Sequence, residues 1–558
     1  MPVQRDGLYS WPEDLIYDGI RQDASESVRR YRNIENMNWR IRGAITKDLG
    51  TRFLSDTAIG SGDYETVTGF DAHFDDGTQK VIVVNGIAGP GQRVYIYNTS
   101  TDAFVQESSP TLHATNRPCA FMFADKLIIV DGNAINAMTA GEVWSTPGST
   151  YDNPCRFGGV YANRAIYAGN PTYPYTFFPG AVLDEETLDV SHSVDVTGSY
   201  GQEITFMGPC GRFWMVGTRH LTRAYYLGLG GPKDWDFDDV SAMVGGVSWE
   251  SYCAPGRAGG GARENFAFVW SDEGPVMFAD GGGKSAPVVI SLWESIQQAV
   301  RGTTWQDVVG LATGSFGKVV TEFCPEYGEV RFAVSEGGES SNNVIYCLDY
   351  QSAVRYAVSG QNPELYPYWR VRKNQIRGWV PCDDLFLVRV DSTGQPSVTG
   401  QSRIFGCRDG YVYEYDAPTV YTDEDPVAAL GYQSFSMKIR KDGYDGYQDG
   451  VREYTKSNRH IFLRTTRANG DITATLYADG GAQHQSQTLN PHGGSGFWGD
   501  GSYWGGGGLW TGGEFATTRA ELATKGKKFD LEIDDEGNIE SDFSINSWSL
   551  SGFVEEEM

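Results

Sequence analysis

Pairs of short apolar strands joined by turn dipeptides recur along most of this chain, and this repetition constrains the fold more than any other feature. The first pair covers residues 80–84 (KVIVV) and 93–97 (RVYIY), and the last covers 403–405 and 411–415. Dipeptides such as Asp409-Gly410 provide the turns. The pairs recur roughly every 40–55 residues, which is the spacing of blades in a β-propeller. The sequence predicts about seven blades, with six or eight as alternatives.

The composition agrees with an all-β protein of more than one domain. The chain has 558 residues, of which 40% are hydrophobic and 13% are aromatic, and this excludes a disordered chain. It contains 70 glycines and 31 tyrosines, as expected for many turns between aromatic-rich strands.

Three segments are predicted from the distribution of these patterns. Residues 1–60 lack the repeat and are expected to form an extended N-terminal arm for assembly, residues 61–417 the propeller, and residues 418–558 a C-terminal β domain resembling a sandwich. Within the propeller, apolar residues at helical spacing in 290–301 (ISLWESIQQAVR) predict a short amphipathic helix inserted between blades.

The net charge of −27 restricts what the protein binds. A groove that grips nucleic acid needs Lys and Arg, so this balance argues against a DNA-gripping surface. It allows a channel wall past which DNA moves without adhering, although a merely soluble acidic surface is the simpler explanation. The N-terminus lacks the features of a signal peptide and no stretch is apolar enough to span a membrane, so we expect synthesis in a cytoplasm.

Residue patterns that carry chemistry are missing from the sequence. It has no HExxH or GxSxG motif, and its eight widely spaced cysteines lack zinc-site spacing and are expected to be small buried apolar groups. The GGGKS segment at 281–285 has Phe278 where a phosphate-binding loop needs glycine. Acidic clusters such as 423–425 are interpreted as solvated turns. We therefore predict no catalytic residues, no cofactor and no metal site, and a protein that is not an enzyme.

Two groups of residues are candidates for assembly contacts. The first is a basic cluster in the arm, which suits docking against an acidic neighbouring subunit; a solvated arm is the alternative. The second is three tryptophans in the glycine-rich segment 497–515, which are expected to pack on a subunit interface or to fold back on their own domain. These candidates are Arg29, Arg30, Arg32, Arg40, Arg42, Trp498, Trp504 and Trp510.

Three stretches resemble one known family. Residues 40–54 (RIRGAITKDLGTRFL) are similar to the segment that leads into the propeller of tail nozzle proteins of short-tailed bacteriophages, also called packaged-DNA stabilisation proteins. Residues 156–189 resemble a blade of these proteins, with an arginine-led strand, an Ala-Gly turn and a strand containing Pro and Phe. The Trp-Gly pairs at 498–499 and 504–505, followed by strands that end at 548–550, resemble their closing β domain.

The resemblance implies a structural protein of the virion tail. Such proteins form a ring, usually of six copies, below the portal and its adaptor, and the ring retains packaged DNA until ejection. DNA would pass without sequence-specific binding, no membrane would be involved, and an acidic lumen would let DNA slide.

Two other functions remain open at this point. A virion propeller for host recognition or glycan binding would stack exposed aromatic side chains on sugar rings, with Tyr173, Tyr175 and Trp235 as candidates. A propeller hydrolase would need a carboxylic acid of raised pKa beside a carboxylate or tyrosine nucleophile.

Overall fold

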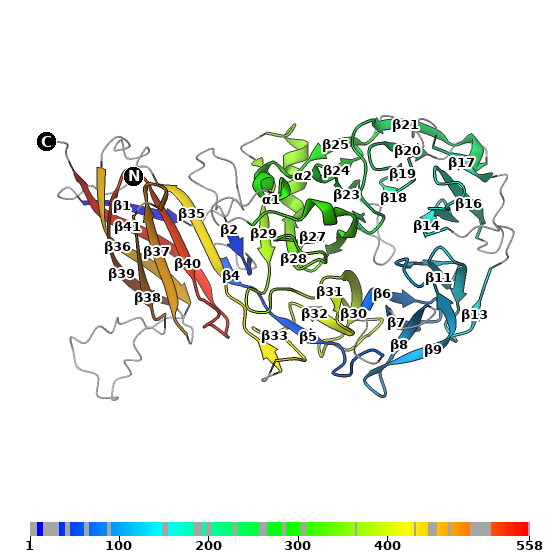
Figure 1. Cartoon of the computed structure of the whole chain (residues 1–558), viewed down its shortest axis with the longest axis horizontal. Coiled ribbons are helices and arrows are strands. Elements are labelled where there is room, and N and C mark those ends of the chain that lie inside the picture. Colours follow the sequence, from blue (N-terminus) through cyan, green and yellow to red (C-terminus); the bar gives the residue numbers. More distant parts are fainter. Residues whose placement is uncertain are drawn as a thin grey trace.

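A ring of small sheets lies beside a two-layered β-sandwich in the computed structural model of the chain (Figure 1). The structure describes residues 8–14, 33–38, 45–60, 66–85, 91–147, 155–183, 192–196, 202–226, 231–255, 265–281, 286–302, 309–362, 365–428, 431–444, 455–466, 470–481, 483–491 and 515–555. Antiparallel pairing dominates both parts, and the predicted all-β fold is confirmed.

Seven blades of four strands form the ring, which confirms the predicted propeller. Blades one to three consist of β6 (Thr66–His73), β7 (Gln79–Asn85), β8 (Gln92–Asn98) and β9 (Ala103–Leu112); β10 (Cys119–Phe123), β11 (Lys126–Val130), β12 (Ile135–Met138) and β13 (Trp144–Ser145); and β14 (Phe157–Tyr161), β15 (Arg164–Ala168), β16 (Thr176–Val182) and β17 (Val194–Asp195).

Blades four and five follow the same chain order. They consist of β18 (Phe206–Cys210), β19 (Phe213–Gly217), β20 (Thr222–Tyr226) and β21 (Asp236–Ser241), and of β22 (Tyr252–Cys253), β23 (Phe266–Ser271), β24 (Gly274–Ala279) and β25 (Val288–Ser291). Blade six consists of β26 (Val320–Cys324), β27 (Glu329–Val334), β28 (Val344–Asp349) and β29 (Trp369–Arg372).

Blade seven closes the ring with strands from two distant parts of the chain. Its first three strands are β30 (Asp384–Val390), β31 (Gln401–Arg408) and β32 (Tyr411–Tyr415), and its fourth is β5 (Thr51–Phe53). β5 pairs with β32, with Thr51 opposite Tyr415. The first strands of all blades contact one another in turn, and β30 contacts β6, so the ring is closed.

The C-terminal domain is a sandwich of two sheets, as predicted. One sheet has the order β3 (Met37–Asn38), β4 (Ile45–Lys47), β41 (Ser544–Glu555), β36 (Thr455–Thr466) and β39 (Phe515–Gly526), with β1 (Leu8–Asp14) also paired to β41. The other continues outward from blade six through β29, β2 (Asn33–Glu35), β35 (Lys438–Tyr444), β40 (Phe529–Asp534), β37 (Ile472–Ala478) and β38 (Gln483–Leu489).

The described parts of the predicted arm are therefore shared between both domains. β2 pairs with β29 of the propeller on one side and with β35 of the sandwich on the other. β4 pairs with β41 and β5 completes blade seven. The sandwich core is made by residues such as Ile439, Ile461 and Leu531, each less than 5% exposed. A two-residue pair, β33 (Asp423–Glu424) and β34 (Tyr432–Gln433), extends blade seven beyond β5.

Helices are short and lie between strands. The predicted helix is confirmed over a shorter length, as η3 (Glu294–Ile296) and α1 (Gln297–Val300), because residues 290 and 291 belong to β25. α2 (Tyr350–Val358) in blade six was not predicted from the sequence; Asp349 caps it by accepting a hydrogen bond from the Ser352 backbone. Further turns of 3-10 helix in the described residues are η2 (Pro232–Asp234), η4 (Thr313–Lys318) and η6 (Asp479–Gly481).

Aromatic side chains fill the spaces between blades. Trp214 of blade four stacks on Tyr161 of blade three with ring centroids 5.5 Å apart. Phe206 of blade four stacks on Tyr252 of blade five at the same distance of 5.5 Å. Each blade buries both faces only against its neighbours, as the repeat predicted. All eight cysteines are buried, which agrees with their predicted role as small apolar groups.

Candidate functional site

The predicted assembly residues lie outside the described residues. Arg29, Arg30, Arg32, Arg40, Arg42, Trp498, Trp504 and Trp510 all fall in the gaps of the described ranges, so their roles stay predictions. Of the aromatic residues considered for glycan stacking, Tyr173 and Tyr175 are 47% and 40% exposed. Trp235 is only 5% exposed and meets Tyr161 edge to face, so it is part of the core and does not present a face to sugars.

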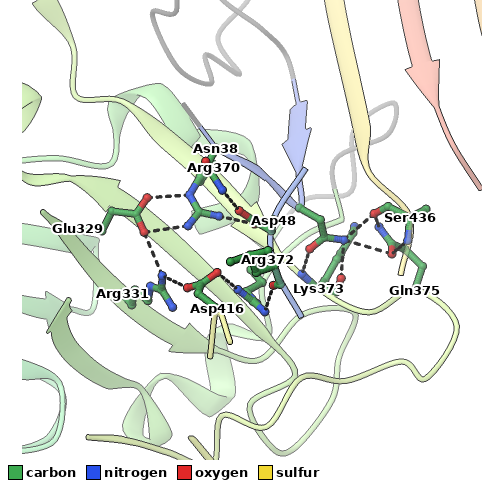
Figure 2. Close-up of polar contacts among 12 residues, drawn as sticks. Asn38, Asp48, Glu329, Arg331, Arg370, Arg372, Lys373, Gln375, Asp416 and Ser436 are labelled. Atoms are coloured by element: carbon green, nitrogen blue, oxygen red, sulfur yellow. Dashed lines mark hydrogen bonds and ion pairs between the residues drawn. The ribbon is translucent and has the colours of Figure 1, made fainter. Parts of the chain in front are cut away.

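The most extensive polar arrangement lies where the propeller meets the sandwich (Figure 2). β27 contributes Glu329 and Arg331, and β29 contributes Arg370 and Arg372. In both strands the two residues are at alternate positions, so their side chains share one face of blade six. This group, together with Asp48 and Asp416, is called the junction network below.

Arg370 is held by carboxylates from two parts of the chain. Its Nε and Nη2 atoms each lie 2.8 Å from an oxygen of Glu329, in a bidentate pair, and its Nη1 donates to Asp48. Asp48 follows β4 and also accepts a hydrogen bond from the Asn38 side chain. Burial alone would lower the pKa of Arg370, but Asp48 and Glu329 outweigh it and raise that pKa well above its usual value.

Asp416 holds the other two guanidinium groups. Arg331 Nη2 lies 2.6 Å from Asp416 Oδ2, and Arg372 Nη1 lies 2.7 Å from Asp416 Oδ1. Arg372 also donates to the backbone carbonyl of Leu49 at 2.7 Å. The network thus pairs three arginines with three carboxylates, all with side chains at most 3% exposed. Its formal charge is zero, which is the condition under which buried ions are tolerated.

Asn36 extends the contacts into the sandwich. Its backbone has a φ of 52°, a left-handed conformation that asparagine tolerates. Its side-chain amide donates to the carbonyls of Lys373 and Ser436, both at 2.6 Å, and its oxygen accepts from the Lys373 backbone at 2.8 Å. One side chain from the N-terminal segment therefore joins blade six to the strand that begins the sandwich.

A second charged cluster lies in the propeller. Arg117 Nε is 3.0 Å from Glu250, and its Nη2 is 2.7 Å from Asp384. Asp384 also accepts hydrogen bonds from Gly69 N at 2.7 Å and Thr68 Oγ1 at 2.9 Å. Burial, and to a lesser extent Asp384, raise the pKa of Glu250 to about 7 although Arg117 opposes this.

The carboxylates of the junction network are committed to ion pairs. Each of these carboxylates is engaged by at least one guanidinium group. Within the described ranges, no group of three His, Cys, Asp or Glu residues has an arrangement that would hold a metal ion. Among the helices that the structure describes, none has the length and apolar character needed to cross a membrane. What the junction network can do is fix two domains to each other.

Neither cluster was predicted from the sequence, although a signal for the junction network is present. Residues 329–334 (EVRFAV) and 369–372 (WRVR) place arginines at alternate positions in otherwise apolar strands. An arginine facing the interior needs a buried partner, so this pattern indicates an ion-pair network. The partners Asp48 and Asp416 could not be named, because they lie far away in the sequence.

Comparisons with known proteins add no family. No protein-family model matches the chain, and no curated protein matches it. Solved structures that it resembles include BBS1N in complex with ARL6DN, at 9% identity and a TM-score of 0.39, covering 67% of this chain and 96% of that one. The WD40 repeats of RRP9 align at 8% identity and a TM-score of 0.36, covering 64% and 98%. Sqt1 of Saccharomyces cerevisiae aligns at 9% identity and a TM-score of 0.36, covering 72% and 98%. Similarity this low carries no argument about function.

Proposed function

We propose that the chain is a structural protein of a bacteriophage tail. Copies of it would form a ring, a nozzle below the portal and adaptor, that retains packaged DNA and lets it pass on ejection. The observation that supports this proposal is the buried junction between propeller and sandwich, whose ion pairs join the two domains to each other. A subunit that holds a column of DNA needs domains that do not move against each other.

The charge of the chain supports the same proposal. At −27, a ring of copies would present a predominantly acidic wall, which repels the phosphate backbone and prevents adhesion. The path for DNA would lie between copies, because Arg117, before blade two, pairs with Glu250, before blade five, and with Asp384 of blade seven, across the ring of a single propeller. A ring with a basic lumen would argue against this proposal.

Assembly of the purified protein tests the proposal. The mass in solution should be measured by light scattering, and negative-stain images should be recorded with and without portal and adaptor proteins of short-tailed phages. Rings with a central opening are the expected result. A monomer that stays monomeric on these partners would contradict the nozzle.

A glycan array distinguishes the main competing function in the same preparation. Binding that is lost in a Tyr173→Ala, Tyr175→Ala double variant would support a host-recognition propeller instead, because these are the exposed aromatic candidates. The nozzle proposal expects no specific glycan signal from the parent protein.

A further inference from the structure

Arg117 reaches across the ring of blades. It lies two residues before β10, the first strand of blade two, and Glu250 lies two residues before β22, the first strand of blade five. Two blades separate them in one direction and three in the other. Because first strands line the centre of the ring, an ion pair of 3.0 Å between these blades has to cross the propeller axis.

The second partner of Arg117 lies at the seam of the ring. Asp384 begins β30 of blade seven, and it accepts hydrogen bonds from Thr68 and Gly69 of blade one. Blade seven is where the ring closes, because its fourth strand, β5, comes from the N-terminal segment directly before blade one. The three blades joined by Arg117 are not neighbours of one another.

The side chains of the cluster are largely buried, so their ion pairs are expected to contribute to stability. The side chains of Arg117, Glu250 and Asp384 are 20%, 9% and 8% exposed. Exposed ion pairs contribute little to stability, whereas removing one partner of a buried pair leaves an uncompensated charge.

We propose that Arg117 acts as a spoke of the propeller, which crosses the axis and holds the closing seam by joining blades two, five and seven. Adjacent blades contact one another through their first strands, whereas Arg117 connects blades that are not neighbours in the ring. It also fills the centre of the ring at this end, so a ligand or polymer does not thread the single propeller there. The inference does not depend on the nozzle proposal.

Hydrogen exchange measured by mass spectrometry on the full-length protein tests the spoke. Arg117→Met should speed amide exchange in peptides covering 66–73, 250–253 and 384–390, which are distant in sequence from the substitution. Peptides of the sandwich, such as 529–534, should be unchanged. Arg156→Met is the matched control, because Arg156 is an exposed residue directly before β14 of blade three. Faster exchange confined to residues near 117, or equal effects of both variants, would overturn the proposal.

A double-mutant cycle between Arg117 and Glu250 gives a second, independent readout. Arg117→Met should lower the melting temperature by several degrees in the parent and by less in Glu250→Gln, where Asp384 is the one carboxylate left without its cation. This difference should be larger at pH 8 than at pH 5, since Glu250 is then ionised; the other groups that face Arg117 are Asp383, Asp384 and Cys407. Strict additivity at pH 8 would refute the spoke.

A double variant and a chemical rescue test the proposal if the single variant Arg117→Met does not fold or is hard to interpret. If Arg117→Met does not fold, the Arg117→Met, Glu250→Gln double variant should fold, and failure of both would contradict the proposal. Methylguanidinium at millimolar concentration should raise the melting temperature of Arg117→Met but not that of the parent or of Arg156→Met. Tetramethylammonium, a bulkier cation without the planar shape of guanidinium, should have no such effect; rescue by both ions alike would argue against a defined guanidinium site.

Discussion

Lys47 and Asp535 form an ion pair of 2.7 Å in which both side chains are fully buried, although 488 residues separate them in the chain. Lys47 ends β4, and Asp535 follows β40 of the facing sheet of the sandwich. The lysine also donates to the carbonyl of Ile539, and Asp535 accepts from the Met437 backbone at 2.7 Å. Burial lowers the pKa of Lys47, with Asp535 opposing the shift. This pair fixes the N-terminal segment inside the sandwich.

Substitution Lys47→Met should destabilise the protein strongly. It leaves the Asp535 carboxylate buried and without its cation, which typically costs about 3–5 kcal/mol. Urea unfolding followed by tryptophan fluorescence measures the change. Lys527→Met is the control, because Lys527 is exposed. Equal stability of the two variants would mean that the buried pair contributes nothing.

A propeller fragment that begins at residue 61 should fail to fold cooperatively. It lacks β5, so blade seven would have three strands with an open edge at β32, and Arg370 would lose Asp48. A synthetic peptide of residues 45–60, added to fragment 61–417, should restore a cooperative thermal transition measured by circular dichroism.

Two altered peptides are the controls for this complementation. A scrambled peptide should have no effect, and a peptide carrying Asp48→Asn should bind more weakly, since it no longer supplies a charge to Arg370. If fragment 61–417 alone melts as sharply and at the same temperature as the full chain, the N-terminal strand is dispensable for closure.

Substitution Gly208→Ala should strain the contact between blades four and five. A Cβ at this position would lie 2.1 Å from the ring of Tyr252, which itself stacks on Phe206. Overpacking of this kind costs about 1–3 kcal/mol. Gly314→Ala is the control, because a Cβ there meets no atom within 4 Å. A thermal midpoint unchanged in Gly208→Ala relative to Gly314→Ala would show that the ring moves aside freely.

The blades could be predicted from sequence because the information is local. Each hairpin joins strands a few residues apart, and turns such as Asp409-Gly410 set the pairing of β31 with β32. The helix α2 was missed although Asp349 carries a capping side chain, because the preceding strand pattern hides so short a helix.

The junction could not be predicted, because its partners are remote in sequence. Asp48 meets Arg370 across 322 positions, and Thr51 meets Asp423 across 372. Local patterns show that Arg331 needs a buried partner, but not which carboxylate supplies it. The partners of Arg117 could not be predicted for the same reason. Its position two residues before a strand does not indicate which residue on the opposite side of the propeller pairs with it.

The pH dependence of stability should reveal Glu336, which follows β27 beside the junction. Burial raises its pKa to about 6, with Lys373 opposing and Glu35 adding to the shift. The folded protein therefore binds a proton that the unfolded chain releases at lower pH, so this group destabilises the fold as pH rises from 4.5 through 6. The expected loss between pH 5 and 8 is about 1 kcal/mol. Glu336→Gln should remove this part of the pH dependence, measured by urea unfolding at each pH.

Glu339→Gln, exposed in the same turn, is the control and should keep the parent slope. Equal slopes in all three proteins would place the titration elsewhere.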